Sequence, residues 1–303
     1  MYDTIIVGAG IAGLTAAIYA ARKRMKYEII SSDFGGQFMV SGEVLNYPGL
    51  PETTGTEFSQ IMAEQARLND VNVKTETVSS ISDLEHGYKI DTGKASYDTR
   101  TVIIASGAKA RKLGVPGEEE FAKKGVTYCS ICDGPLFSGM DVAVIGGGDS
   151  ALEAVDFLKD IASKIYVITN NNEFTAHEYL REKVAANPKV EVIYDALTKE
   201  IYGKDFVTGL RYEKDGREEA IDVRGVFIEI GRTPNTEAFK DFIELDEHGH
   251  ISIDCQTRTS RPAIFAAGDC ASGHEYQYVI AAGQGCMALI KAARYLAQEK
   301  TIK

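Results

Sequence analysis

Two glycine turns, each set between an apolar strand and a helix-forming stretch, constrain the fold of this chain more than any other feature. The first turn, G-A-G-I-A-G at positions 8–13, follows the β-branched run Tyr2–Val7 and leads into Leu14–Ala21. At this spacing the first glycine permits a tight turn, the second lets a pyrophosphate approach the backbone, and the third lets helix and strand pack closely. A glycine turn in an ordinary α/β domain is the alternative.

The second turn, G-G-G-D-S-A from Gly146 to Ala151, repeats this arrangement in the middle of the chain. It follows the apolar run Asp141–Ile145 and precedes a predicted helix to about residue 162 and a strand over Lys164–Thr169. With 303 residues the chain is long enough for two domains, or for one large one. Two fingerprints far apart favour an α/β fold with two Rossmann-like dinucleotide-binding domains.

A dinucleotide fingerprint also includes an acidic residue at the end of the second strand, and the first fingerprint meets this requirement only approximately. The strand predicted over Tyr27–Ile30 should end beside an adenosine ribose, but Ser31 and Ser32 follow it, and Asp33 is the nearest carboxylate.

A C-x-x-C pair, Cys129 and Cys132, lies between the two turns. Two cysteines at this spacing can open and close a disulfide without unfolding their surroundings, and the spacing activates one thiol. Half of a zinc site is the alternative, but it needs a second ligand pair, and the remaining cysteines stand singly. Redox chemistry is therefore favoured, and no metal is expected.

Composition excludes some classes of function. The net charge of −11 disfavours binding to nucleic acid or to an anionic membrane. The uncharged run Thr4–Ala21 resembles a membrane span or a signal peptide in length, but Asp3 replaces the basic start that a signal peptide needs, and glycines interrupt the run. We therefore expect a cytoplasmic protein, and in that compartment a close cysteine pair is more often catalytic than structural.

Taken in order, these motifs resemble those of the low-molecular-weight thioredoxin reductases, which are FAD-dependent pyridine nucleotide-disulfide oxidoreductases. The resemblance covers nearly the whole chain, and the cysteine pair before the second glycine turn is its most specific part. The other shared motifs are G-G-Q at 35–37, N-Y-P-G at 46–49, A-S-G at 105–107, C-D-G at 132–134, G-R-T-P-N at 231–235 and G-D at 268–269.

The resemblance implies two three-layer ββα domains, with the second inserted into the first. Residues 1–112 plus 238–303 would form the FAD-binding domain, and residues 113–237 the nicotinamide-binding domain that carries the cysteine pair. It also implies that one domain rotates against the other about connections near Lys112 and Pro234.

The resemblance also assigns site residues. Cys129 and Cys132 would form the redox disulfide, and Asp133 would be the acid-base group beside it, although a helix cap is an equal alternative for Asp133. FAD contacts are implied for Gly8, Gly10, Ala12, Gly13, Gly35, Gly36, Gln37, Asn46, Ser106, Gly107, Gly268, Asp269, Tyr278 and Val279. Nicotinamide nucleotide contacts are implied for Gly146, Gly148, Asp149, Ser150, Ala151, Asn170, Asn171, Gly231 and Arg232.

The implied reaction passes electrons from a nicotinamide nucleotide through FAD and the disulfide to thioredoxin or a glutaredoxin-like protein. A homodimer is implied as well. Which cysteine attacks the protein substrate is left open.

One departure from the family concerns the electron donor. Family members that use NADPH carry an H-R-R-x-x-x-R segment after the second strand of the nicotinamide domain, where arginines pair with the 2′-phosphate. Here the segment 169–175 reads T-N-N-N-E-F-T, with Glu173 as its only charge. We estimate a penalty of about 2 kcal/mol or more against NADPH, so NADH is favoured, or weak discrimination between the two.

Three alternatives stay open at this stage. Some relatives use ferredoxin or a deazaflavin in place of a nicotinamide. A ferredoxin-NADP reductase of similar architecture is disfavoured by the cysteine pair, and a redox-sensing flavoprotein without steady turnover is not excluded.

Overall fold

The chain divides into two compact units, each described here by itself: unit 1 comprises Met1–Lys109 and Thr233–Lys303, and unit 2 comprises Ala110–Arg232. The structure, a computed structural model, describes residues 1–40, 43–273 and 276–302. Unit 2 is inserted in the sequence of unit 1. The two boundaries fall in β9 (Ala108–Ala110) and β18 (Arg232–Pro234), which pair with each other.

The central sheet of unit 1 is built on β1 (Tyr2–Val7), which pairs in parallel with β2 (Tyr27–Ser31) and β8 (Ser96–Ile104). The strand order is β5-β2-β1-β8-β7-β6, and β19 pairs with the carboxyl-terminal half of β8. The remaining strands of unit 1 are β3 (Glu43–Val44), β4 (Thr53–Thr54), β5 (Val73–Thr75), β6 (Ser80–Leu84), β7 (Gly87–Asp91) and β19 (Ile264–Ala266).

Both faces of this sheet are covered. Because successive side chains of a strand point to opposite faces, one strand contributes to the core on each side. In β1, Ile6 packs into the core formed with α1 (Ile11–Arg22). Its neighbours Ile5 and Val7 pack into a second core with Tyr88 of β7. Unit 1 therefore has the layered α/β arrangement that the sequence predicts.

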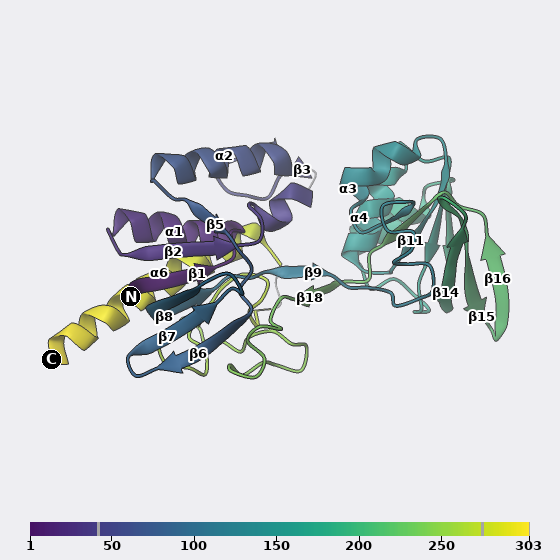
Figure 1. Cartoon of the computed structure of the whole chain (residues 1–303). Helices are drawn as coiled ribbons and strands as arrows, with labels where there is room; N and C mark the ends of the chain where they lie inside the picture. The colour runs from purple at the N-terminus through teal and green to yellow at the C-terminus, as the bar shows by residue number, and fades with distance from the viewer. Residues whose placement is uncertain (41–42, 274–275, 303) are drawn as a thin grey trace. The chain divides into compact units, whose positions relative to one another are not determined.

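Two helices of unit 1, α1 and α6 (Tyr278–Ile302), lie side by side (Figure 1). A Cβ atom at Gly285 would lie 2.1 Å from the carbonyl oxygen of Ala12, so only glycine allows this approach. The helix α6 begins at Tyr278 and runs through both Gly283 and Gly285. Gly285 within this helix permits the close packing of α6 against α1. The other helices of unit 1 are η1 (Gly36–Val40) and α2 (Gly55–Leu68).

Unit 2 contains a parallel sheet of order β10-β17-β11-β12-β13, with β11 (Asp141–Ile145) at its centre. Val142 and Val144 of β11 pack against α4 (Asp149–Leu158), and Ala143 and Ile145 pack on the opposite side. The other elements of this layer pair are β10 (Val126–Thr127), α3 (Ser130–Asp133), η2 (Gly134–Phe137), β12 (Lys164–Ile168), α5 (Glu178–Ala185), β13 (Val190–Ile193) and β17 (Gly225–Ile228).

The third layer of unit 2 is an antiparallel sheet of β14 (Ala196–Gly203), β15 (Val207–Lys214) and β16 (Arg217–Ile221). It lies across the parallel sheet from α4 (Figure 1). Ile201, Leu210 and Tyr212 supply the buried face that packs against β11. None of these three strands is predicted from the sequence.

No helix in the described part of the chain combines the length and the apolar character needed to cross a membrane.

Candidate active site: a disulfide and two nucleotide cradles

The first glycine turn of unit 1 sits between β1 and the start of α1. Gly8 has a φ of +104°, and a Cβ there would lie 2.1 Å from the Ala105 carbonyl oxygen. A Cβ at Gly13 would lie 1.9 Å from the Gly8 carbonyl oxygen, whereas a Cβ at Gly10 would meet nothing within 4 Å. Gly8 and Gly13 thus close the turn, and the space beside Gly10, the N-cap of α1, is open to a ligand.

The G-G-Q turn lies against this first turn. Gly35 donates a backbone hydrogen bond to Ala9 (2.9 Å), and a Cβ at Gly36 would come within 3.4 Å of the Gly10 Cα. The Gln37 side chain donates to the Ala108 carbonyl (3.0 Å), and the Tyr278 hydroxyl donates to the Gln37 carbonyl (3.2 Å). These bonds bring residues far apart in sequence to one edge of the sheet.

Most of the remaining residues assigned to FAD lie on loops of the same unit, whereas Ala12 lies in α1 and Val279 in α6. Ser106 and Asn235 exchange two hydrogen bonds, of 2.7 and 3.0 Å, just past the end of β8. The Asn46 side chain donates to Gln277 (3.2 Å), immediately before α6. Gly268 has a φ of +75° and its N–H donates to Gln284 (2.7 Å), which places the half-buried Asp269 after β19.

This constellation suits an elongated dinucleotide with a polyhydroxyl chain. An open backbone at a helix N-terminus accepts a pyrophosphate, and a half-buried carboxylate accepts hydroxyl donors. The residues present therefore fit FAD: Gly10 and Gly36 would hold its phosphates, and Asp269 would accept from its ribityl hydroxyls.

The redox pair of unit 2 is at the start of α3. Cys129 and Cys132 form a disulfide with their Cα atoms 5.4 Å apart. Cys129 is the N-cap of α3, and the Cys132 N–H points at the Cys129 sulfur (3.1 Å). Cys129 is half-buried and Cys132 is exposed. A donor aimed at Cys129 stabilises negative charge on that sulfur once the bond opens.

Asp133 is the last residue of α3 and the N-cap residue of η2, but its side chain makes no capping hydrogen bond to η2. Its carboxylate accepts a short hydrogen bond from the Thr127 hydroxyl, and the same hydroxyl oxygen accepts from the Cys129 N–H (3.2 Å). Thr127 therefore links Asp133 to the cysteine segment.

A buried carboxylate that the sequence analysis missed also supports this segment. Glu118 is 1% exposed and accepts hydrogen bonds from the Leu113 N–H (2.8 Å), the Gly114 N–H (2.6 Å) and the Tyr128 hydroxyl (2.6 Å). Burial and this carboxylate raise the pKa of Tyr128, so the hydroxyl stays a donor. Three donors satisfy Glu118, which holds Tyr128 beside Cys129.

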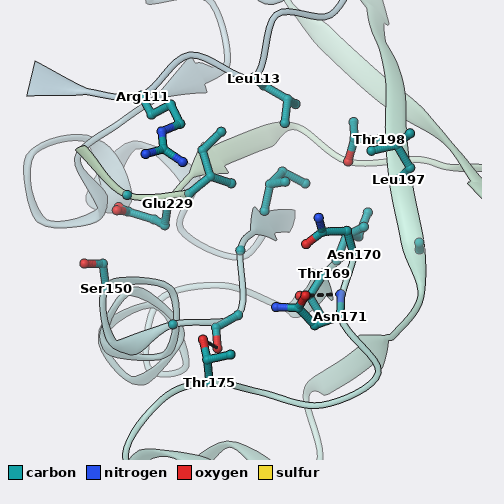
Figure 2. Close-up of a pocket in the computed structure, with 18 of the residues that line it drawn as sticks. Arg111, Leu113, Ser150, Thr169, Asn170, Asn171, Thr175, Leu197, Thr198 and Glu229 are labelled. Carbon is teal, nitrogen blue, oxygen red and sulfur yellow. Dashed lines mark hydrogen bonds between the residues drawn. The ribbon is translucent and has the colours of Figure 1, made fainter. Parts of the chain in front are cut away.

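A pocket of about 500 Å³ lies at the carboxyl edge of the parallel sheet in unit 2 (Figure 2). The second glycine turn forms its floor. Gly146 has a φ of +141°, and a Cβ there would lie 2.1 Å from the Glu229 carbonyl oxygen. Gly148 is the N-cap of α4, and Asp149 and Ser150 begin that helix and line the pocket.

Most of the residues assigned to the nicotinamide nucleotide line this pocket. The exceptions are Ala151 and Arg232, which are not among the lining residues. Ala151 is fully buried in the core between α4 and its sheet, so its role is packing. Lining residues that the sequence analysis did not assign include Arg111, Thr175, Leu197, Thr198 and Glu229. The chain around β9, β14 and β17 brings most of these to the pocket.

The segment after β12 carries no positive charge into the pocket. Asn170 and Asn171 are exposed lining residues, and the Asn171 N–H donates to the Thr169 hydroxyl (3.3 Å, Figure 2). Thr175 is tied to the glycine turn by its N–H, which donates to the Gly147 carbonyl (2.8 Å). The side chains offered to a ribose here are neutral amides and hydroxyls.

No group of three or more His, Cys, Asp or Glu side chains is placed to hold a metal ion within residues 1–40, 43–273 and 276–302.

Comparison with known proteins places this geometry in a family. The family model described as pyridine nucleotide-disulphide oxidoreductase matches residues 2–293. The thioredoxin reductase of Mycolicibacterium smegmatis is 40% identical over 305 residues, which cover 99% of this chain and 98% of that protein.

A second relative is one of the subunits of alkyl hydroperoxide reductase in Staphylococcus aureus (strain MSSA476), which is 40% identical over 299 residues, or 97% of this chain. The chain spans only 59% of the length of that relative. Among solved structures, Lactococcus lactis thioredoxin reductase in its FR conformation superposes with a TM-score of 0.92 at 35% identity, over 98% of this chain and 100% of that one.

Proposed function

Because the chain belongs to the pyridine nucleotide-disulphide oxidoreductase family, among its low-molecular-weight thioredoxin reductases, we propose that it reduces the disulfide of thioredoxin or of a glutaredoxin-like protein. Electrons would come from a nicotinamide nucleotide through FAD and the Cys129–Cys132 disulfide. The observation that carries this proposal is the disulfide at the start of α3, in the unit that also holds the nucleotide pocket. Residues 1–112 plus 238–303 would bind FAD, and residues 113–237 the nicotinamide.

The chain's own part in the reaction is thiol–disulfide exchange. FAD, when bound, accepts a hydride from the nicotinamide and supplies two electrons that open the disulfide. Cys129 is the nucleophile in this proposal, because the Cys132 N–H stabilises its thiolate. The Cys129 sulfur attacks one sulfur of the substrate disulfide, and Cys132 then displaces the second substrate thiol and restores the Cys129–Cys132 bond.

Asp133 would supply the proton that this exchange requires. Each departing thiolate of the substrate takes up one proton, and a carboxyl within reach can deliver it. Thr127 holds Asp133 and the Cys129 backbone together, so the carboxyl stays beside the reacting sulfurs.

NADH is the proposed electron donor. The alternative is that the protein discriminates only weakly between NADH and NADPH. A dianionic 2′-phosphate would face Asn170 and Asn171, which offer neutral donors where arginines would pair bidentately. The nearby Glu173 adds repulsion. A 2′-hydroxyl, by contrast, is well matched to a side-chain amide.

Anaerobic titration of the purified yellow protein with NADH, and separately with NADPH, tests this proposal through the loss of flavin absorbance. We expect NADH to bleach the flavin at a much lower concentration than NADPH. The donor assignment is wrong if NADPH is the better reductant. If dithionite bleaches the flavin and neither nucleotide does, the donor is a ferredoxin or a deazaflavin instead.

Two further features of the proposal concern assembly and compartment. A homodimer is supported by the exposed apolar side chains Ile280 and Met287 of α6, and sedimentation of the holoprotein would measure its mass. A reductase of protein disulfides works where thiols are kept reduced, which favours the cytoplasm.

A further inference from the structure

Two carboxylates that thiol–disulfide exchange does not use, Asp149 and Glu229, line the pocket of unit 2, and Glu229 is the one that does not belong to the glycine turn or α4. Glu229 is the first residue after β17 and is half-buried. Its side chain lies at the same end of the pocket as Arg111, while Asn170, Asn171 and Thr198 lie at the other end (Figure 2). Among the described residues, none makes a hydrogen bond or ion pair with its carboxylate.

Strand order places Glu229 on the nicotinamide side of a bound dinucleotide. The glycine turn that would hold the pyrophosphate follows β11, and β12 and β17 flank β11 on either side. Asn170 and Asn171 follow β12, beside the exposed apolar Leu197, and suit the adenosine half. The other half of the molecule must then extend over the end of β17, toward Glu229 and Gly231.

We propose that Glu229 is a specificity-determining residue, whose carboxylate favours the oxidised nucleotide, with its cationic pyridinium ring, over ligands that lack this charge. This inference rests on the proposed function, since it assumes that a nicotinamide nucleotide occupies the pocket. A carboxylate attracts a cation across several ångströms in a partly buried pocket, whereas neutral reduced nicotinamide gains nothing comparable. The enzyme would therefore retain its oxidised product, and product inhibition would follow the charge on Glu229.

The surroundings of Glu229 make this charge sensitive to pH near neutrality. Burial raises the pKa of Glu229 to about 7, with Arg232 opposing the rise and Glu153 of α4 adding to it. Arg111 lines the same end of the pocket. Asp149, the first residue of α4, lies within ion-pair distance of His177. With a pKa of about 7, the ionised fraction rises from about one tenth at pH 6 to about nine tenths at pH 8.

Calorimetric titration of the oxidised holoprotein with NAD⁺ and with ADP-ribose separates the roles of Glu229. ADP-ribose has the same pyrophosphate and both riboses, but no pyridinium. At pH 8 we expect Glu229→Gln to weaken NAD⁺ binding by about fivefold to tenfold and ADP-ribose binding by less than about twofold. Glu229→Asp should retain most of the affinity for NAD⁺. The flavin spectrum of each variant checks its fold.

The pH dependence gives a second readout. Between pH 6 and pH 8, the affinity of the wild type for NAD⁺ should rise relative to its affinity for ADP-ribose. Any contribution of His177 is common to both ligands. Glu229→Gln should remove the difference between them. Glu153→Gln is the matched control: it removes a repulsive neighbour outside the pocket lining, so the midpoint of the rise should move to lower pH.

Three results would overturn the inference. Unchanged NAD⁺ affinity in Glu229→Gln would show that the carboxylate does not face the pyridinium. Equal losses for NAD⁺ and ADP-ribose would show a ribose contact or a structural role. If the wild type binds neither ligand, the nicotinamide assignment of the pocket fails, and the proposal fails with it.

Discussion

At the residue scale, the proposed choice of electron donor rests on neutral side chains at two positions. Asn170 and Asn171 are exposed, line the pocket and follow the strand next to the glycine turn. An arginine at either position would add a planar, charged donor that a phosphate binds bidentately. Because both side chains already face solvent, such a change costs little in folding.

The double substitution Asn170→Arg with Asn171→Arg should therefore raise the preference for NADPH. We expect kcat/KM for NADPH to rise about tenfold or more, equivalent to about 1.4 kcal/mol, while that for NADH falls slightly. Steady-state rates with each nucleotide measure this. The single substitution Glu218→Arg on β16, at an exposed residue outside the pocket lining, changes the net charge by the same two units and controls for the added charge. An equal gain there would rule out a local phosphate contact.

The task proposed for Asp133 differs from that of these residues, since it is proton delivery to the sulfurs and not contact with the nucleotide. Asp133→Asn keeps the shape of the side chain and its ability to accept from Thr127, but it has no proton to give. The rate of substrate reduction should fall by about a hundredfold or more, while anaerobic bleaching of the flavin by NADH stays unchanged. Stopped-flow absorbance separates the two steps. A matched loss in both steps would point to misfolding of α3.

At the element scale, two glycines of α6 have opposite roles although they are close together in sequence. A Cβ at Gly285 would collide with the backbone of α1, whereas Gly283 is exposed and a Cβ there meets nothing within 4 Å. Gly285 is needed for helix packing, and Gly283 only weakens the helix.

Gly285→Ala should destabilise the protein by roughly 1–3 kcal/mol, the usual range for overpacking. Gly283→Ala in the same helix should stabilise it by roughly 0.5–1 kcal/mol. Urea unfolding followed by circular dichroism compares the two variants. Equal effects would mean that α1 and α6 are not in the close contact described.

Elements with a strong local signal could be predicted from the sequence, and those fixed by tertiary contacts could not. The strands that precede the two glycine turns could be predicted from their apolar runs, and the disulfide segment from the spacing of its cysteines. The strand β16, by contrast, reads R-E-E-A-I and is almost fully exposed, so nothing in its composition marks it as a strand. Its pairing with β15 creates it.

The candidate site divides in the same way. The glycines of the two turns and the cysteine pair were predicted from their spacing, whereas the other residues of the site were assigned through the family resemblance. Glu118, Arg111 and Glu229 were missed because none of them belongs to a motif: Glu118 opens a run of three glutamates, Arg111 precedes Lys112, and Glu229 follows an apolar strand. Only the folded chain brings Glu118 to Tyr128, and Arg111 and Glu229 to one end of a pocket.

At the scale of the whole molecule, unit 1 holds the first glycine turn, and unit 2 holds the second glycine turn with its pocket and the Cys129–Cys132 disulfide. This division predicts that the two half-reactions can be separated by mutation. A protein without the disulfide should still accept electrons from NADH but should have no route to a protein substrate.

The most direct test is therefore NADH-dependent reduction of thioredoxin by the wild type and by Cys132→Ser, with anaerobic NADH consumption and new thioredoxin thiols measured in the same sample. We expect the wild type to form two thiols for each NADH consumed, and Cys132→Ser to form none in steady state while NADH still bleaches its flavin. Consumption of NADH by the wild type without new thiols, or continued thiol formation by Cys132→Ser, would contradict a reductase that works through the Cys129–Cys132 disulfide.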